Sequence, residues 1–267
     1  MVAEFSVFAL KGKELLMHSN SLLLLTSSLS VPHGFTTRQG GVSDSYYSSL
    51  NLGLSTGDNA EVVEKNRDVV LKHFGVSRSQ VSILEQVHGN TVVVAEAAWH
   101  KHKADAQITN DPDLLLVIGM ADCLPILLYD SVQKVVGAAH AGWRGTSLKI
   151  AANVVEKMQS EFSSSPSNIH IAMGPAICSE NYQVGSEVFE NFMKSEFPKT
   201  VFEPDGERYQ LDLVAANKFV LGQAGVLPEN TEALNLCTFA DQEKFYSHRR
   251  DGQKRGSHWA VIKLKNS

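Results

Sequence analysis

The chain has 267 residues and a formal net charge of −5. Hydrophobic residues make up 43% of it and charged residues 20%, values typical of a globular protein with a sizeable buried core. This mildly acidic composition argues against a nucleic-acid-binding surface.

The N-terminus and the cysteines bear on the cellular compartment of the protein. The first residues have no basic start and no sustained apolar stretch, and no apolar run is long enough to span a bilayer. Cys123, Cys178 and Cys237 are too few and too scattered for a disulfide framework, and an odd number leaves a free thiol. We therefore expect a cytoplasmic protein in a reducing compartment, with no membrane partner.

The predicted elements combine hairpins with separate helices. Apolar runs rich in β-branched residues predict strands at 81–87, 91–97, 114–119, 125–130, 134–140 and 169–174. HGN at 88–90 predicts a tight turn joining the first two strands as a hairpin, and DSVQ at 130–133 predicts a second hairpin. Apolar residues at helical spacing predict a helix at 146–162 and shorter helices at 185–195 and 212–223. This pattern favours an α+β fold with largely antiparallel strands, in one domain over residues 1–267.

Three of the apolar segments end close to a residue that can bind a metal. These residues are His88 in EQVHGN, Cys123 in ADCLP and His140 in AHAGWRG. Two imidazoles and one thiolate suit zinc and leave its fourth position open, as in a catalytic site. Their separations are long and irregular, so spacing alone also fits a buried cysteine and surface histidines.

Glycines near these residues strengthen the metal hypothesis. Gly89, Gly142 and Gly145 each follow a candidate ligand closely, as expected where the backbone turns sharply or approaches a ligand. Asp122 adjoins Cys123 and has two possible roles, as a proton shuttle or as the carboxylate that orients a ligating histidine. The residues leave both roles open.

Several polar residues are candidates for substrate binding. The loop segments 33–43 and 49–53 are dense in polar residues and glycine, and from them we select Arg38 and Asn51. Arg144 follows His140 and can bind an oxyanion through its planar guanidinium, although a structural salt bridge is about as plausible. Gln86 precedes His88, and Arg249 lies in a basic segment whose composition also fits a solvated turn.

Taken together, the motifs resemble the laccase-domain family, also described as multicopper polyphenol oxidases, purine nucleoside phosphorylases and peptidoglycan editing factors. They are FTTRQGGVS, SLNLG, QVHGN, ADCLPILLYD, AHAGWRGT, GPAICSENYQVG and CTF followed by FYSHRRDG. The resemblance implies a zinc ion held by His88, Cys123 and His140. It also implies a sandwich of β-layers flanked by helices, similar to a bacterial toxin domain with a Cys–His hydrolase site.

The same resemblance implies the activity. It implies phosphorolysis of adenosine, inosine and methylthioadenosine, and deamination of adenosine, with purine nucleosides and phosphate as the small-molecule partners. After RRDG the family usually continues with Thr-Gly-Arg, whereas this chain reads QKRG. Arg255 can take the place of that arginine if the loop differs slightly, so the role of this tail stays open.

Three alternatives remain beside the zinc enzyme. Cys123 as nucleophile with His140 as base would suit amide hydrolysis, such as the editing of peptidoglycan precursors. Copper could occupy the same ligands, although polyphenol oxidation by a multicopper enzyme needs clustered imidazoles and the chain has ten histidines in all. In the third alternative, zinc has only a structural role and holds together the loops of a binding protein that has no catalytic activity.

Overall fold

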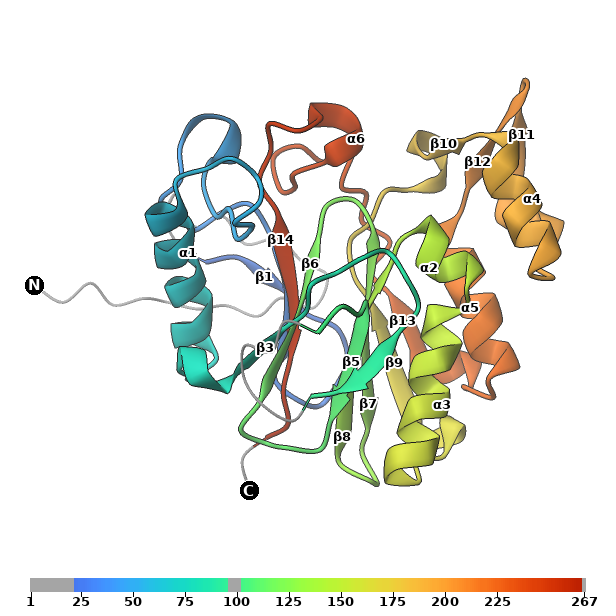
Figure 1. Ribbon diagram of the computed structural model, residues 1–267, viewed down its shortest axis with the longest axis horizontal. Helices are drawn as coiled ribbons and strands as arrows, with labels where there is room; N and C mark the ends of the chain where they lie inside the picture. Colours follow the sequence, from blue (N-terminus) through green and yellow to red (C-terminus); the bar gives the residue numbers. More distant parts are fainter. Residues whose placement is uncertain (1–21, 96–101, 266–267) are drawn as a thin grey trace, which may run out of the picture.

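The computed structural model describes residues 22–95 and 102–265. Within these residues two sheets lie face to face, with helices on both outer sides (Figure 1). The first sheet has the order β1 (Leu24–Leu25), β2 (His33–Thr36), β14 (His258–Ile262), β6 (Leu115–Met120) and β3 (Val81–Ile83). The second has the order β13 (Thr231–Ala233), β9 (Ile169–Met173), β7 (Leu124–Asp130), β8 (Val135–Ala141), β5 (Ala106–Thr109) and β4 (Val92–Val94). This is the α+β architecture that the sequence predicts.

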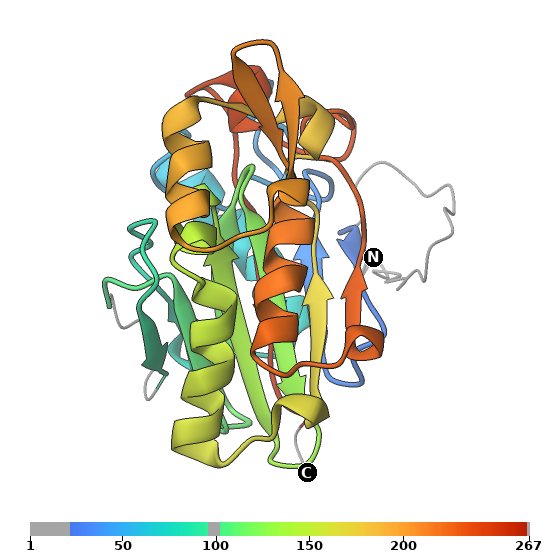
Figure 2. The same cartoon turned by 90° about the vertical axis from the view of Figure 1, so that its right-hand side faces the viewer.

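Helices cover the outer face of each sheet. Helix α1 (Ala60–His73) packs on the first sheet, and α2 (Trp143–Ser147), α3 (Ile150–Phe162) and α5 (Leu213–Gln223) lie beside the second. Figure 2 shows α3 and α5 side by side across that sheet. At one end, β10 (Gln183–Val184), β12 (Arg208–Leu211) and β11 (Phe202–Asp205) form a small third sheet beside α4 (Ser186–Lys194). The short helix α6 (His248–Asp251) precedes β14.

Strand β6 shows why the layers form. Its side chains alternate between two faces, because successive residues of a strand point to opposite sides. Leu116 and Ile118 belong to the core between the two sheets, whereas Leu115 and Val117 belong to the core beneath α1. Each of these side chains is fully buried and contributes roughly 1.5–3 kcal/mol to folding. A continuous apolar run therefore marks a strand that is covered on both faces.

A strand lies in each of the six predicted segments, although β3 and β4 cover only part of 81–87 and 91–97, and residues 96–97 lie outside the described residues. The hairpin around DSVQ is confirmed, with β7 and β8 antiparallel. The predicted hairpin around HGN is wrong. Strand β3 pairs in parallel with β6, while β4 pairs in parallel with β5 in the other sheet. The turn at 88–90 therefore carries the chain from one sheet to the other, which local sequence cannot distinguish from a hairpin.

The helical predictions need two corrections. The region 146–162 is not one helix, because Lys149 has φ 58° and separates α2 from α3. Helix α1 was not predicted. The predicted helices at 185–195 and 212–223 correspond to α4 and α5.

The cysteines depart from expectation. Cys178 and Cys237 are paired as a disulfide with their Cα atoms 5.1 Å apart, and Cys123 is free. A backbone bridge between Ala176 and Cys237 brings the two segments together, and nothing in a sequence separation of 59 residues predicts this. The cysteines therefore no longer support the expectation of a reducing compartment. Among the described residues, no helix is long and apolar enough to cross a membrane.

Candidate metal centre

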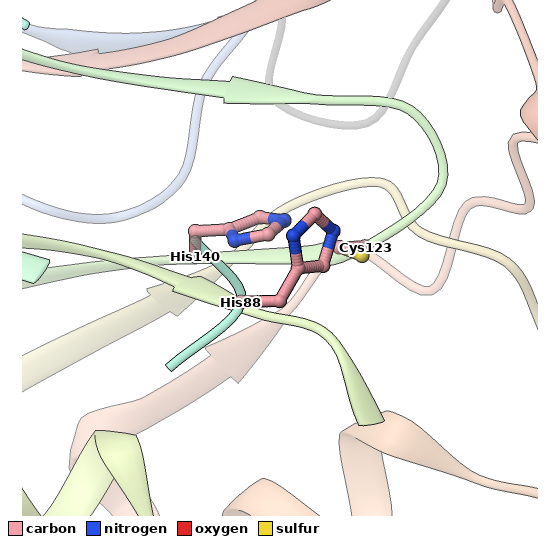
Figure 3. A group of neighbouring side chains, drawn as sticks. All are labelled: His88, Cys123 and His140. Carbon is pink, nitrogen blue, oxygen red and sulfur yellow. The ribbon is translucent and has the colours of Figure 1, made fainter. Parts of the chain in front are cut away.

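The β7–β8 hairpin brings the first two candidate ligands together. Cys123 immediately precedes β7, and His140 near the end of β8 pairs with Pro125. His88 arrives from the turn between the two sheets (Figure 3). The ligand atoms of the three residues all lie within 4.8 Å of one another. The predicted convergence of His88, Cys123 and His140 is confirmed, and this donor set of two nitrogens and one sulfur fits zinc.

Asp105 holds two of the three candidate ligands in place. Its carboxylate Oδ1 accepts hydrogen bonds from His140 Nδ1 at 2.9 Å and from the backbone N–H of His88 at 2.9 Å. Its Oδ2 accepts from the N–H of Gly89 at 2.7 Å and of Val87 at 3.2 Å. These bonds hold His88 at φ 60°, a left-handed conformation that a non-glycine residue rarely adopts. They also leave Nε2 of His140 free to bind a metal.

The electrostatics among Cys123, His140 and His88 favour a thiolate beside an imidazolium. Burial has the largest influence on Cys123 and raises its pKa, but His140 and His88 outweigh it and bring the pKa to about 6. Burial lowers the pKa of His140, whereas Cys123 and Asp105 raise it, to about 9. A deprotonated sulfur is the form that binds zinc.

Close packing explains two of the three glycines. A Cβ on Gly142 would lie 2.8 Å from Cys123 Sγ, and a Cβ on Gly145 would lie 2.9 Å from the carbonyl oxygen of Gly89. Any side chain at position 142 would therefore displace the ligand sulfur. At Gly89 the nearest contact of a Cβ would be an ordinary 3.6 Å, so space does not require this glycine.

Asp122 does not orient a ligating histidine, a role that Asp105 fills. Its Oδ1 accepts a hydrogen bond from the Thr238 hydroxyl at 2.7 Å, and its Oδ2 accepts from the backbone N–H of Arg249 at 2.8 Å. Asp122 thus ties the strand end that carries Cys123 to the start of α6. Asp105 lies in the segment ADAQIT, in which no sequence pattern links it to His140. The hydrogen bonds are the signal that identifies it.

Three of the predicted substrate residues are engaged with the protein itself. Arg38 donates to the carbonyls of Ser48 and Gln242 and stacks on a tyrosine ring. Both ends of the Gln86 amide bond to the backbone of Gly119 at 2.8 Å. Asn51 is fully buried, and its side-chain oxygen accepts from the backbone N–H groups of residues 53 and 257.

The other two predicted substrate residues gather around Tyr182. The phenol of Tyr182, whose pKa is raised by burial, also feels the charges of Cys123 and Asp122 and those of Arg144 and Arg249. The Arg249 guanidinium lies over the Tyr182 ring at 5.1 Å. That of Arg144 lies over the neighbouring Trp143 ring at 4.4 Å. No sequence pattern singles out Tyr182, whose phenol lies where the charges of both arginines and of Cys123 and Asp122 act together.

Comparison with known proteins identifies the family. The model of the family described as "Multi-copper polyphenol oxidoreductase laccase" matches residues 32–265. The chain belongs to this family. It is 43% identical to a protein of Deinococcus radiodurans named "Purine nucleoside phosphorylase", over 91% of this chain and 92% of that protein. It is 38% identical to "Purine nucleoside phosphorylase YfiH" of Escherichia coli, over 81% and 87% of the two chains.

Solved structures of the family have the same fold. The YfiH protein of Bacillus licheniformis superposes with a TM-score of 0.87 at 32% identity, covering 91% of this chain and 96% of that one. YlmD from Geobacillus stearothermophilus superposes with a TM-score of 0.83 at 31% identity, covering 88% and 92%. The family resemblance and the fold expected from the sequence are thereby confirmed.

Proposed function

We propose that this protein is a zinc-dependent purine nucleoside phosphorylase that acts on adenosine, inosine and methylthioadenosine and also deaminates adenosine. The convergence of His88, Cys123 and His140 carries the proposal. Relatives named purine nucleoside phosphorylases support it. Bound by His88, Cys123 and His140, zinc would supply Lewis-acid chemistry.

Different residues of the chain have different roles in the proposed phosphorolysis. In this reaction a phosphate oxygen bonds to ribose C1′ while the bond from C1′ to the purine nitrogen breaks, and the purine leaves with the electron pair and takes a proton. Arg144 and Arg249 contribute to phosphate binding through their positive charge, because both guanidinium groups act on Tyr182 beside the centre. Asp122, next to Cys123, carries the proton. In deamination, water replaces the amino group at C6 of the purine and ammonia leaves.

Arg38, Asn51 and Gln86 complete the proposed substrate site. Their side chains hold backbone segments around the centre, and we propose that the substrate contacts those segments. Substitution of any of the three should then raise KM for the nucleoside more than it lowers kcat.

Metal analysis and assays on one preparation test the proposal. Protein purified without added metal should contain about one equivalent of zinc, the number that one tridentate centre holds. With adenosine and phosphate it should release adenine and ribose 1-phosphate, and inosine should also form. Cys123→Ala should lose both the metal and these activities. Copper in place of zinc, or adenosine left unchanged by metal-loaded protein, would refute the proposal.

The order Asp105, His140 and Cys123 favours a second candidate function. An imidazole held by a carboxylate on one side and next to a thiol on the other is the arrangement of a Cys–His hydrolase. Peptidoglycan precursors would be its amide substrates. Amide hydrolysis that survives complete chelation and is abolished by alkylation of Cys123 would favour this candidate over the zinc enzyme.

A further inference from the structure

Arg255 is a half-buried arginine whose hydrogen-bond donors are only partly used. Its side chain is half-buried, and Nη1 donates to the carbonyl of Gly256 at 3.0 Å. The buried Nε has no hydrogen-bond partner in the part of the chain that the structure describes. Leaving such a donor unpaired costs about 1–3 kcal/mol, so a partner outside the protein would recover that energy.

The free donors of Arg255 form one edge of the guanidinium. Nε and Nη2 point to the same side of the group, away from the Nη1 that is bonded to Gly256. This Nε/Nη2 edge is the fork that binds two oxygens of a carboxylate or a phosphate at once. Within residues 22–95 and 102–265, no carboxylate forms a salt bridge with it; the nearby Asp251 pairs with Arg250.

The segment that carries Arg255 is fixed beside the metal centre. Two residues further on, Ser257 donates from its hydroxyl to the carbonyl of Met120 at 3.2 Å and from its backbone N–H to Asn51 at 2.9 Å. Met120 ends β6, and the chain then runs through Asp122 to Cys123. The charges of Asp122 and Cys123 both act on the Arg255 guanidinium. Both Asp122 oxygens accept from other donors, so this carboxylate does not fill the fork.

We propose that the Nε/Nη2 edge of Arg255 binds an oxyanion beside the metal centre, and that in the proposed reaction this oxyanion is inorganic phosphate. The identity of the anion rests on the proposed function, whereas the anion site rests on the unpaired edge alone. Arg38, by contrast, uses Nε and Nη1 on backbone carbonyls and has no comparable free fork.

Calorimetric titration of zinc-loaded protein with inorganic phosphate tests this assignment. Arg255→Gln should weaken phosphate binding by roughly 10- to 100-fold, the loss expected for charge-assisted hydrogen bonds. Arg255→Lys keeps the charge but not the fork, and its phosphate affinity should lie between those of the wild type and Arg255→Gln. Lys254→Gln removes the same charge from the exposed neighbouring residue and should change affinity by about twofold at most.

The outcomes separate the anion site from the proposed function. Wild-type phosphate affinity in Arg255→Gln would overturn the assignment, as would the absence of phosphate binding by the wild type. Should Arg255→Gln fail to fold, the phosphate affinities of Arg255→Lys and Lys254→Gln are compared instead. A weaker affinity in Arg255→Lys supports the assignment, and equal affinities overturn it. Phosphate binding that depends on Arg255 without any release of purine base would uphold the anion site and refute the phosphorylase. If Arg255→Gln releases purine base with an unchanged KM for phosphate, the phosphorylase is upheld and the anion site is refuted.

Discussion

Replacing Asp105 with asparagine should weaken the metal centre from outside its ligand set. Each Asp105 oxygen accepts two hydrogen bonds, Oδ1 from His140 and His88 and Oδ2 from Gly89 and Val87. An amide keeps one oxygen and turns an NH₂ group toward the other two donors, whichever way it rotates. Two of the four bonds are therefore lost.

The magnitude follows from these two bonds. At about 1.5 kcal/mol for each bond to a charged acceptor, Asp105→Asn should lower the free energy of unfolding by about 3 kcal/mol. Zinc affinity should fall roughly 10- to 100-fold, as when a carboxylate behind a ligating histidine is removed. Competition with a chromophoric chelator measures the affinity, and urea denaturation of the metal-free protein measures the stability.

Asp130 offers a matched control. It is also a fully buried carboxylate that accepts backbone N–H bonds, from Val132 and Gln133, but it lies at the opposite end of the β7–β8 hairpin from Cys123. Both bonds go to Oδ1, which asparagine keeps, so Asp130→Asn removes a buried carboxylate far from the candidate ligands and should leave zinc affinity unchanged. Wild-type zinc affinity in Asp105→Asn would show that the carboxylate does not position the candidate ligands.

Three further predictions concern the thiols and their surroundings. Gly142→Ala places a Cβ 2.8 Å from Cys123 Sγ, so zinc affinity should fall at least about tenfold; wild-type affinity would contradict this packing. In metal-free protein the pKa of Cys123 is lowered to about 6, so its thiolate fraction and its alkylation rate by iodoacetamide should rise through pH 6 and level off near neutrality. A rate that continues to climb above about pH 8, as for an ordinary thiol, would show that the histidines do not stabilise the thiolate. Denatured, unreduced protein should react with a thiol reagent only at Cys123, and additional reactive thiols would rule out the disulfide between Cys178 and Cys237.

The central hairpin could be predicted from sequence because its signals are local. Strands β7 and β8 are buried at every position, so each appears as a mostly apolar run, and only residues 131–134 separate them. An antiparallel pair with so short a connection has a narrow range of registers. The proximity of Cys123 and His140 follows from this register.

The third ligand and its support could not be predicted in the same way. The local sequence predicts that the turn at His88 joins two strands of one sheet, but the turn crosses between sheets. Which sheet a short strand joins depends on partners far along the chain. The carboxylate of Asp105 accepts the hydrogen bonds that fix this turn. Asp105 is 16 positions along the sequence from Gly89, the nearest of the residues that donate to it.

The sequence by itself determined the α+β class, six of the strands in the two large sheets and, through its motifs, the resemblance to the family, because apolar runs and motifs consist of residues that are close together in the sequence. Only the tertiary structure decided which carboxylate supports the metal ligands, which arginines are engaged by the backbone, and where an unpaired guanidinium edge remains. Those properties depend on hydrogen-bond partners that folding brings together, and a donor's partner is defined by distance and angle in space rather than by position along the chain.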